Sequence, residues 1–88
     1  MIEASQTSSI DERIERERAA LAELARHIHG RPELRFEEHE AARAIAEYLE
    51  RLGFAVERGV GGMPTAFRAR AGRKTGPRVA VLAEYDAL

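Results

Sequence analysis

The stretch Val79-Ala80-Val81-Leu82-Ala83-Glu84-Tyr85-Asp86 decides the fold class of this 88-residue chain. Its first five residues are all apolar, which is typical of a strand covered on both faces in the middle of a sheet. Its last three form a polar cluster, and ligands of open α/β sheets collect beyond the carboxyl ends of the strands. The stretch therefore predicts a central strand over residues 79–83 that leads into a candidate site.

Two shorter strands are expected before it, because apolar and polar residues alternate over Phe54–Glu57 and again over Thr65–Ala71. The glycine-rich residues 59–64 form the loop between them. We interpret this loop as a plain turn, because phosphate-binding loops lead from a strand into a helix. Residues 72–77 make a second turn, short enough to predict that the strands it joins are antiparallel neighbours.

A first helical pattern runs from Ser9 to about His29. It opens on a Ser-x-x-Glu capping box, and it ends before Gly30, which can take a left-handed cap, and Pro32, which cannot continue a helix. Residues 1–8 are expected to be a disordered N-terminus. The apolar positions of this helix make one stripe, and its charged positions would face water.

A second helical pattern runs from about Glu37 to Leu52, and Gly53 ends it. The predicted order is thus α-α-β-β-β over residues 9–88, an α/β fold with helices on a sheet. Two helices cannot cover both faces of a sheet with a buried central strand, so one apolar face would stay bare. We therefore expect the chain to be the opening segment of a larger α/β protein.

Composition and charge exclude several function classes. The 14 basic residues are balanced by 15 acidic ones, which gives a net charge of −1 and no large positive surface for nucleic acid. No stretch approaches the roughly 20 apolar residues of a membrane span, and the N-terminus lacks the features of a signal peptide. There is no Cys for disulfides or thiolate metal sites. We expect a soluble, cytoplasmic protein that binds neither nucleic acid nor membrane.

Glu84 and Asp86 are the candidate site residues. They are two positions apart in an extended segment, so both carboxylates would point to one side, roughly 6 to 7 Å apart. Two acids there could orient a metal-binding His, bind a metal directly or transfer a proton. The alternative is a polar strand end that simply meets solvent.

The three histidines are interpreted as structural. His27 and His29 do not share a helix face, and a cation near a helix C-terminus is stabilised by the helix dipole. His39 lies among acidic residues at a solvated helix start.

The motifs of the chain are Ile28–Leu34 with Glu37 and Glu38, Leu52–Phe54, Gly61–Ala69, and Gly76–Pro77 leading to Val81–Leu88. In this order they resemble the N-terminal part of the M20 family of metallopeptidases and amidohydrolases. His-x-x-Pro-Glu-Leu alone is a modest signal, but with Pro-Thr-Ala-Phe and Glu-Tyr-Asp-Ala-Leu it is specific. The last motif is similar to an amidohydrolase branch with aminoacylase-1-like proteins, Xaa-Arg type dipeptidases and aminobenzoyl-glutamate hydrolases.

The resemblance implies hydrolysis of an amide bond in an N-acyl amino acid, a dipeptide or an aminobenzoyl-glutamate-like substrate. It further implies a zinc-peptidase-like α/β/α sandwich with a mixed sheet, a homodimer formed through an inserted lid domain, and one or two zinc or manganese ions. In the family a metal-bound water attacks the scissile carbonyl, with a glutamate as base.

Carried over by position, Asp86 matches the family Asp that supports the metal centre. Glu84 stands where other branches have a metal-binding His, and it matches the amidohydrolase branch. The family's Gly-His-Ala-Cys-Gly-His type segment and its remaining ligands are expected C-terminal to Leu88. No metal ligand is therefore expected within this segment, which alone is expected to be inactive.

Two rival functions fit the same residues less well. A small interaction module, with the two helices as an amphipathic hairpin, leaves Gly-Gly-Met-Pro-Thr-Ala-Phe and the apolar final stretch unexplained. An Arg-rich nucleic-acid binder is disfavoured by the acid balance and by the lack of aromatic residues for base stacking.

Overall fold

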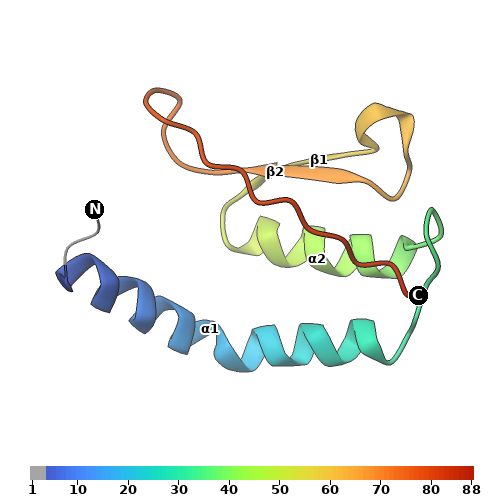
Figure 1. The fold of residues 1–88 in the computed structure, drawn as a ribbon, viewed down its shortest axis with the longest axis horizontal. Coiled ribbons are helices and arrows are strands. Elements are labelled where there is room, and N and C mark those ends of the chain that lie inside the picture. Colours follow the sequence, from blue (N-terminus) through green and yellow to red (C-terminus); the bar gives the residue numbers. More distant parts are fainter. Residues whose placement is uncertain (1–3) are drawn as a thin grey trace.

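The computed structural model describes residues 4–88 and arranges them in layers (Figure 1). A two-stranded hairpin lies over one helix, and that helix lies over the C-terminal half of a longer one. The elements in chain order are α1 (Ala4–His29), α2 (His39–Arg51), β1 (Ala55–Arg58), the 3₁₀ turn η1 (Val60–Gly62) and β2 (Phe67–Arg70). No described helix is both long and apolar enough to cross a membrane.

Helix α1 begins at Ala4, so the predicted start at Ser9 is wrong. The capping-box residues lie inside the helix. No Gly or Pro separates Ala4 from Ser9, and adding one residue to a formed helix gains a hydrogen bond at little cost. Residues 4–8 of the expected disordered terminus are helical, and residues 1–3 lie outside the described part of the chain.

The end of α1 at His29 is confirmed, but the predicted left-handed cap at Gly30 is wrong. Instead, the Gly30 N–H donates to the Arg26 carbonyl at 2.9 Å. A Cβ at Gly30 would lie 3.3 Å from that same carbonyl oxygen. Glycine therefore suits this position by allowing a close approach to the last turn.

Helix α2 begins at His39, two residues after the predicted start, because its cap comes from a distant side chain. The Glu33 carboxylate accepts the N–H groups of Glu40 at 3.0 Å and Ala41 at 2.8 Å. The predicted end is confirmed, with Gly53 in the left-handed region at φ 98°. The negative charge of Glu33 at the N-terminus of α2 is also stabilised by the positive end of the helix dipole.

The first two predicted strands are confirmed in shorter form as an antiparallel pair. The register joins Ala55 to Arg70 at one end and Arg58 to Phe67 at the other. The glycine-rich loop contains η1, which is preceded by Gly59 at φ 72°. That left-handed conformation suits glycine and lets the chain reverse between the strands.

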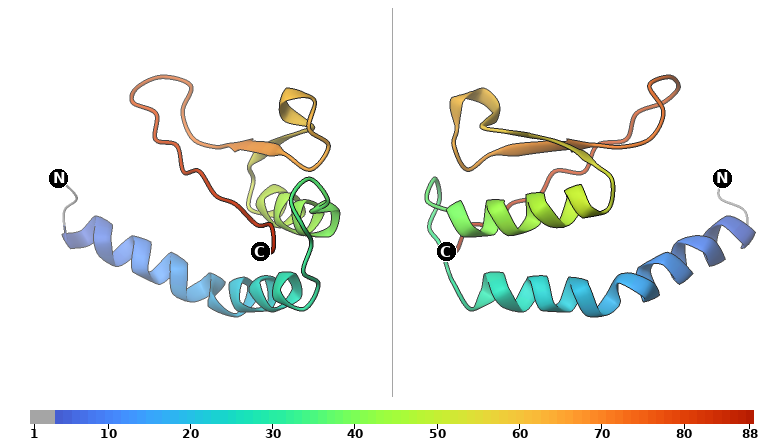
Figure 2. Two further views of the ribbon diagram at one scale, coloured as in Figure 1. Left: turned by 45° about the vertical axis from the view of Figure 1, so that its right-hand side comes forward. Right: turned by 180° about the vertical axis from the view of Figure 1, so that it is seen from behind.

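The predicted central strand over residues 79–83 is wrong. The segment is extended but belongs to no strand, and the side chains of Val79, Val81 and Leu82 are 92, 88 and 96% exposed. Figures 1 and 2 show it running past α2 toward the α1–α2 loop, and it does not pair with β2. A strand apolar on both faces is stable only when neighbours pair its backbone and cover both faces, and residues 4–88 do not supply them. The structure is therefore a small α/β fold of two helices and a two-stranded sheet.

The buried core is small and centres on α2, which contacts both α1 and the hairpin. Its buried side chains are Ala41, Ala46 and Tyr48, and buried Thr65 joins them from the loop before β2. The N-terminal half of α1 extends beyond the other elements (Figure 2), and Ile10 and Ile14 there are about half exposed. The predicted apolar stripe of α1 is thus covered only near its C-terminal end.

Candidate active site

The candidate site lies where the C-terminal segment meets the loop between α1 and α2 (Figure 1). Residues Tyr85, Asp86 and Ala87 are half-buried there, in contrast to the exposed residues 71–84. Three segments far apart in the sequence meet at this point: the α1–α2 loop, the residues before β2, and residues 85–87. Specific hydrogen bonds and one ring contact hold these segments together.

Tyr85 joins the C-terminal segment to the hairpin. Its hydroxyl donates a hydrogen bond to the backbone carbonyl of Thr65, and its ring stacks on Phe67 with centroids 6.0 Å apart and planes at 23°. Burial, together with the negative charge of Glu38, raises the pKa of the Tyr85 phenol. The phenol therefore stays protonated as a hydrogen-bond donor at neutral pH.

Thr65 continues this contact toward α2. Its Oγ1 donates to Oε1 of Glu38 at 3.1 Å, and its side chain is almost fully buried. Glu38 directly precedes the first residue of α2. The Tyr85 hydroxyl, Thr65 and Glu38 thus link the terminal segment, the hairpin and the start of α2.

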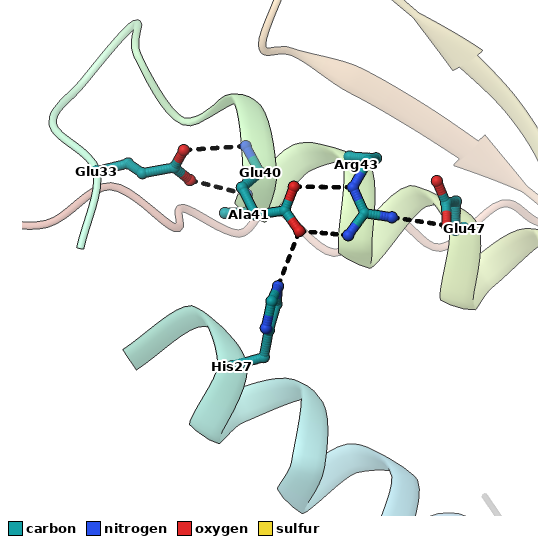
Figure 3. Close-up of polar contacts among 6 residues, drawn as sticks. All are labelled: His27, Glu33, Glu40, Ala41, Arg43 and Glu47. Carbon is teal, nitrogen blue, oxygen red and sulfur yellow. Dashed lines mark hydrogen bonds and ion pairs between the residues drawn. The ribbon is translucent and has the colours of Figure 1, made fainter. Parts of the chain in front are cut away.

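A second contact holds the other side of Asp86. The N–H of Ala87 donates to the backbone carbonyl of Glu33 at 2.7 Å. The side chain of the same Glu33 caps α2 (Figure 3), and hydrogen bonds from the backbone N–H groups of Glu40 and Ala41 lower its pKa. The main chain next to Asp86 is therefore fixed relative to the N-terminus of α2.

Asp86 lies between these two contacts, half-buried, in a shallow open hollow. The hollow is lined by Leu34, Arg35, Glu37, Asp86, Ala87 and Leu88. Glu84, the other predicted site residue, is exposed. Within residues 4–88, neither carboxylate makes a side-chain hydrogen bond or ion pair. Asp86 is thus a carboxylate whose backbone is held and whose oxygens are free to accept a hydrogen bond, bind a cation or take a proton.

Away from the hollow, a polar network ties α1 to α2 (Figure 3). The Nε2 atom of His27 lies 2.9 Å from Oε1 of Glu40, and Arg43 binds Glu40 through its Nε at 2.8 Å. Arg43 also donates to Glu47 at 2.8 Å. Hydrogen bonds from Arg43 and, second, from His27 lower the pKa of Glu40 to about 2. His27 thus has a structural partner on α2 that the sequence interpretation, based on the α1 dipole, did not identify.

The family resemblance implies a zinc or manganese ion, but the described residues do not form a complete set of ligands for one. In the described part of the chain, no three His, Asp or Glu side chains come together in a way that could hold a metal ion. His29 and His39 are exposed and belong to no such cluster among the described residues. No single place within residues 4–88 therefore brings together three such side chains around a metal ion.

Sequence reasoning missed four residues that build the surroundings of Asp86: Glu33, Glu38, Thr65 and Tyr85. A signal for them was present, since all four lie within the motif stretches of the chain. In the sequence those motifs indicate only the family. The structure shows that they meet in space around Asp86.

Comparison with known proteins gives several related hydrolases. The chain is 46% identical over 79 residues to one of the subunits of p-aminobenzoyl-glutamate hydrolase of Escherichia coli, a match to 90% of this chain and 16% of that protein. It is 42% identical over 69 residues to thermostable carboxypeptidase 2 of Saccharolobus solfataricus and 41% identical over 68 residues to the putative amidohydrolase YhaA of Bacillus subtilis. Each of these two matches covers 77% of this chain and 17% of the relative.

The chain thus spans only about a sixth of the length of these relatives. No protein-family model matches it, and no solved structure matches it significantly. The three relatives are, by their names, hydrolases of amide or peptide bonds. The chain is thus related in sequence to these amidohydrolases and carboxypeptidases, and this relationship is consistent with the resemblance to the M20 family seen in its motifs.

Proposed function

We propose that this chain is the N-terminal part of the catalytic domain of a metal-dependent amide hydrolase. One structural observation supports the proposal beyond the relatives. Three motif stretches, containing Glu33, Thr65 and Tyr85, meet at the main chain on either side of Asp86. These contacts fix the main chain beside a carboxylate that makes no hydrogen bond or ion pair within residues 4–88, as a carboxylate reserved for a ligand from elsewhere would require.

In this proposal Asp86 supports the metal centre rather than forming it alone. A carboxylate commonly accepts a hydrogen bond from a metal-binding His and so fixes the orientation of that ring. When bound, zinc or manganese would supply Lewis-acid assistance to amide hydrolysis. Its ligands would come from residues C-terminal to Leu88, as in the family. Exposed Glu84 has a subordinate role, because nothing in residues 4–88 holds its side chain in place.

The proposed substrate is an N-acyl amino acid, a dipeptide or an aminobenzoyl-glutamate-like compound, each with an amide bond to an amino acid. We propose a zinc-peptidase-like sandwich for the complete domain. A homodimer formed through a separate domain and a cytoplasmic location complete the proposal.

A helical-hairpin interaction module is the rival proposal. The two helices do pack together as such a module requires. The side chain of Tyr48 contacts Glu17, and that of His27 contacts Glu40, across the α1–α2 interface. It accounts for neither the anchored residues 85–87 nor the related hydrolases, so it is not favoured.

The proposal is tested by assaying the protein, together with any sequence encoded beyond Leu88, after incubation with zinc or manganese. The substrates are an acyl amino acid series, a dipeptide series and p-aminobenzoyl-glutamate. Metal-dependent release of the free amino acid from at least one series supports the proposal. A stop codon directly after Leu88 in an intact gene, or no hydrolysis and no metal uptake by the complete product, contradicts it.

A further inference from the structure

The Asp86 side chain makes no hydrogen bond or ion pair within residues 4–88, so the polar contacts that fix its position are those of its neighbours in the chain. Tyr85 contacts the hairpin side through Thr65 and Phe67, and Ala87 contacts the α1–α2 loop through Glu33. Because the residues before and after Asp86 are both held by other parts of the fold, the backbone of Asp86 can move little. The residues before it, 71–84, are exposed and lack such contacts.

The contact of Ala87 uses only backbone atoms, whereas that of Tyr85 depends on its side chain. The Ala87 contact is made by backbone atoms alone and survives most substitutions. The Tyr85 contact depends on one hydroxyl and one ring, and its acceptor, the Thr65 carbonyl, belongs to a residue that is only 5% exposed. Removing the hydroxyl leaves that carbonyl without its partner and frees the segment on the side that leads into Asp86.

We propose that Tyr85 is a positioning residue for Asp86, whose backbone it holds in place through its hydroxyl bond to Thr65 and its stacking on Phe67. The proposal rests on the function proposed for Asp86. It adds that the tyrosine of the Glu-Tyr-Asp stretch acts on the reaction only through the aspartate beside it. Proper placement matters because a small displacement of a group that supports catalysis costs roughly 10- to 100-fold in activity.

The test compares Tyr85→Phe with Tyr48→Phe. Both variants delete one phenol oxygen from a tyrosine that donates to a protein acceptor, but Tyr48 donates to Glu17 on α1, away from Asp86. Amide hydrogen exchange of the metal-free protein is measured at Asp86 and Ala87, and kcat and KM are measured for the substrate found active. Circular dichroism and thermal unfolding show whether each variant folds.

For Tyr85→Phe we expect exchange at Asp86 and Ala87 to rise about fivefold, the effect of losing one typical hydrogen bond. We expect kcat to fall at least about tenfold with KM nearly unchanged. Tyr48→Phe should leave exchange at these two amides and kcat unchanged while lowering the unfolding temperature at least as much. If Tyr85→Phe does not fold, Phe67→Leu serves instead and is expected to lower kcat in the same direction.

Unchanged exchange and unchanged kcat in folded Tyr85→Phe would overturn the positioning role, as would equal losses of kcat in both tyrosine variants. Asp86→Asn separates this outcome from failure of the proposed function. If Asp86→Asn is inactive and Tyr85→Phe is fully active, the function stands and the positioning role is wrong. If Asp86→Asn is fully active, the function proposed for Asp86 is wrong whatever Tyr85 does.

Discussion

The Nε2 atom of His27, in the last turn of α1, lies 2.9 Å from Oε1 of Glu40, in the first turn of α2. Glu40 also binds Arg43 one turn further along its own helix. The Glu40 carboxylate thus joins α1 to α2, and the positive charge of Arg43 within α2 balances its negative charge. The charge state of Glu40 should therefore govern how the helix pair responds to acid.

We expect Glu40→Gln to lower the unfolding temperature at pH 7. The folded-state pKa of Glu40, about 2, lies below its ordinary value of 4.5, so ionised Glu40 stabilises the fold above about pH 4.5. That contribution is lost as the pH falls toward 2. The difference in unfolding temperature between wild type and variant should shrink over this range, as followed by circular dichroism. A difference that is equally large at pH 7 and pH 2 would contradict the prediction.

The two partners of Glu40 provide an internal control for this prediction. Arg43 is the larger cause of the lowered pKa and His27 the smaller one. NMR titration of Glu40 should therefore show a greater rise in its pKa for Arg43→Gln than for His27→Gln. The reverse order would mean that the contact between the helices, rather than the one within α2, dominates.

Glu33→Ala should destabilise α2 more than Glu37→Ala does. Glu33 accepts two backbone N–H groups of the first turn of α2, whereas Glu37 is an exposed carboxylate of the same loop. The lowered pKa of Glu33 means that its contribution is present at neutral pH and is lost on acidification. Thermal unfolding at pH 7 and at low pH checks this, and Glu33→Gln, which keeps one acceptor oxygen, should lie between. Equal effects of Glu33→Ala and Glu37→Ala would show that the cap contributes nothing.

Ala46→Leu should lower the free energy of unfolding by about 1 to 3 kcal/mol. Ala46 is only 1% exposed, so three additional heavy atoms have no space without a shift of α2 against its neighbours. Ala20→Leu on the exposed surface of α1 makes the same chemical change without that conflict. Chemical denaturation of the two variants distinguishes them, and a neutral Ala46→Leu would mean that the core can expand at this position.

Under the proposed function, Asp86→Ala should lower metal occupancy or turnover by a large factor, because the proposed support of a metal ligand is lost. Partners of this kind commonly contribute about 10- to 100-fold in metal affinity or activity. Glu84→Ala, which removes an exposed carboxylate two residues away, should have a smaller effect. Metal analysis after dialysis and amide hydrolysis rates check both. Unchanged metal content and unchanged rates in Asp86→Ala would refute the role given to Asp86.

Sequence periodicity predicted both helices and the hairpin, because these elements depend on local patterns and on Gly53 and Gly59 at their ends. It failed at the start of α1, where a capping box proved compatible with a helix interior. It also failed for residues 79–83, because a central strand depends on neighbours that local sequence does not supply.

The candidate site was predicted only as a position along the chain. Asp86 was identified because it follows an apolar stretch, but the contacts that hold its backbone join residues far apart in sequence. The bond from Tyr85 to Thr65 and that from Ala87 to Glu33 follow no local rule of spacing. Only the folded path of the C-terminal segment beside α2 brings these pairs together.

The exposed segment around Val81 also affects how the isolated chain behaves in solution. Three large apolar side chains about 90% exposed lie on extended backbone that, within residues 4–88, has no strand partner. Such a segment is a template on which other molecules can add strands and aggregate. A lysine in place of Val81 would oppose that self-association and favour a monodisperse preparation of the isolated chain.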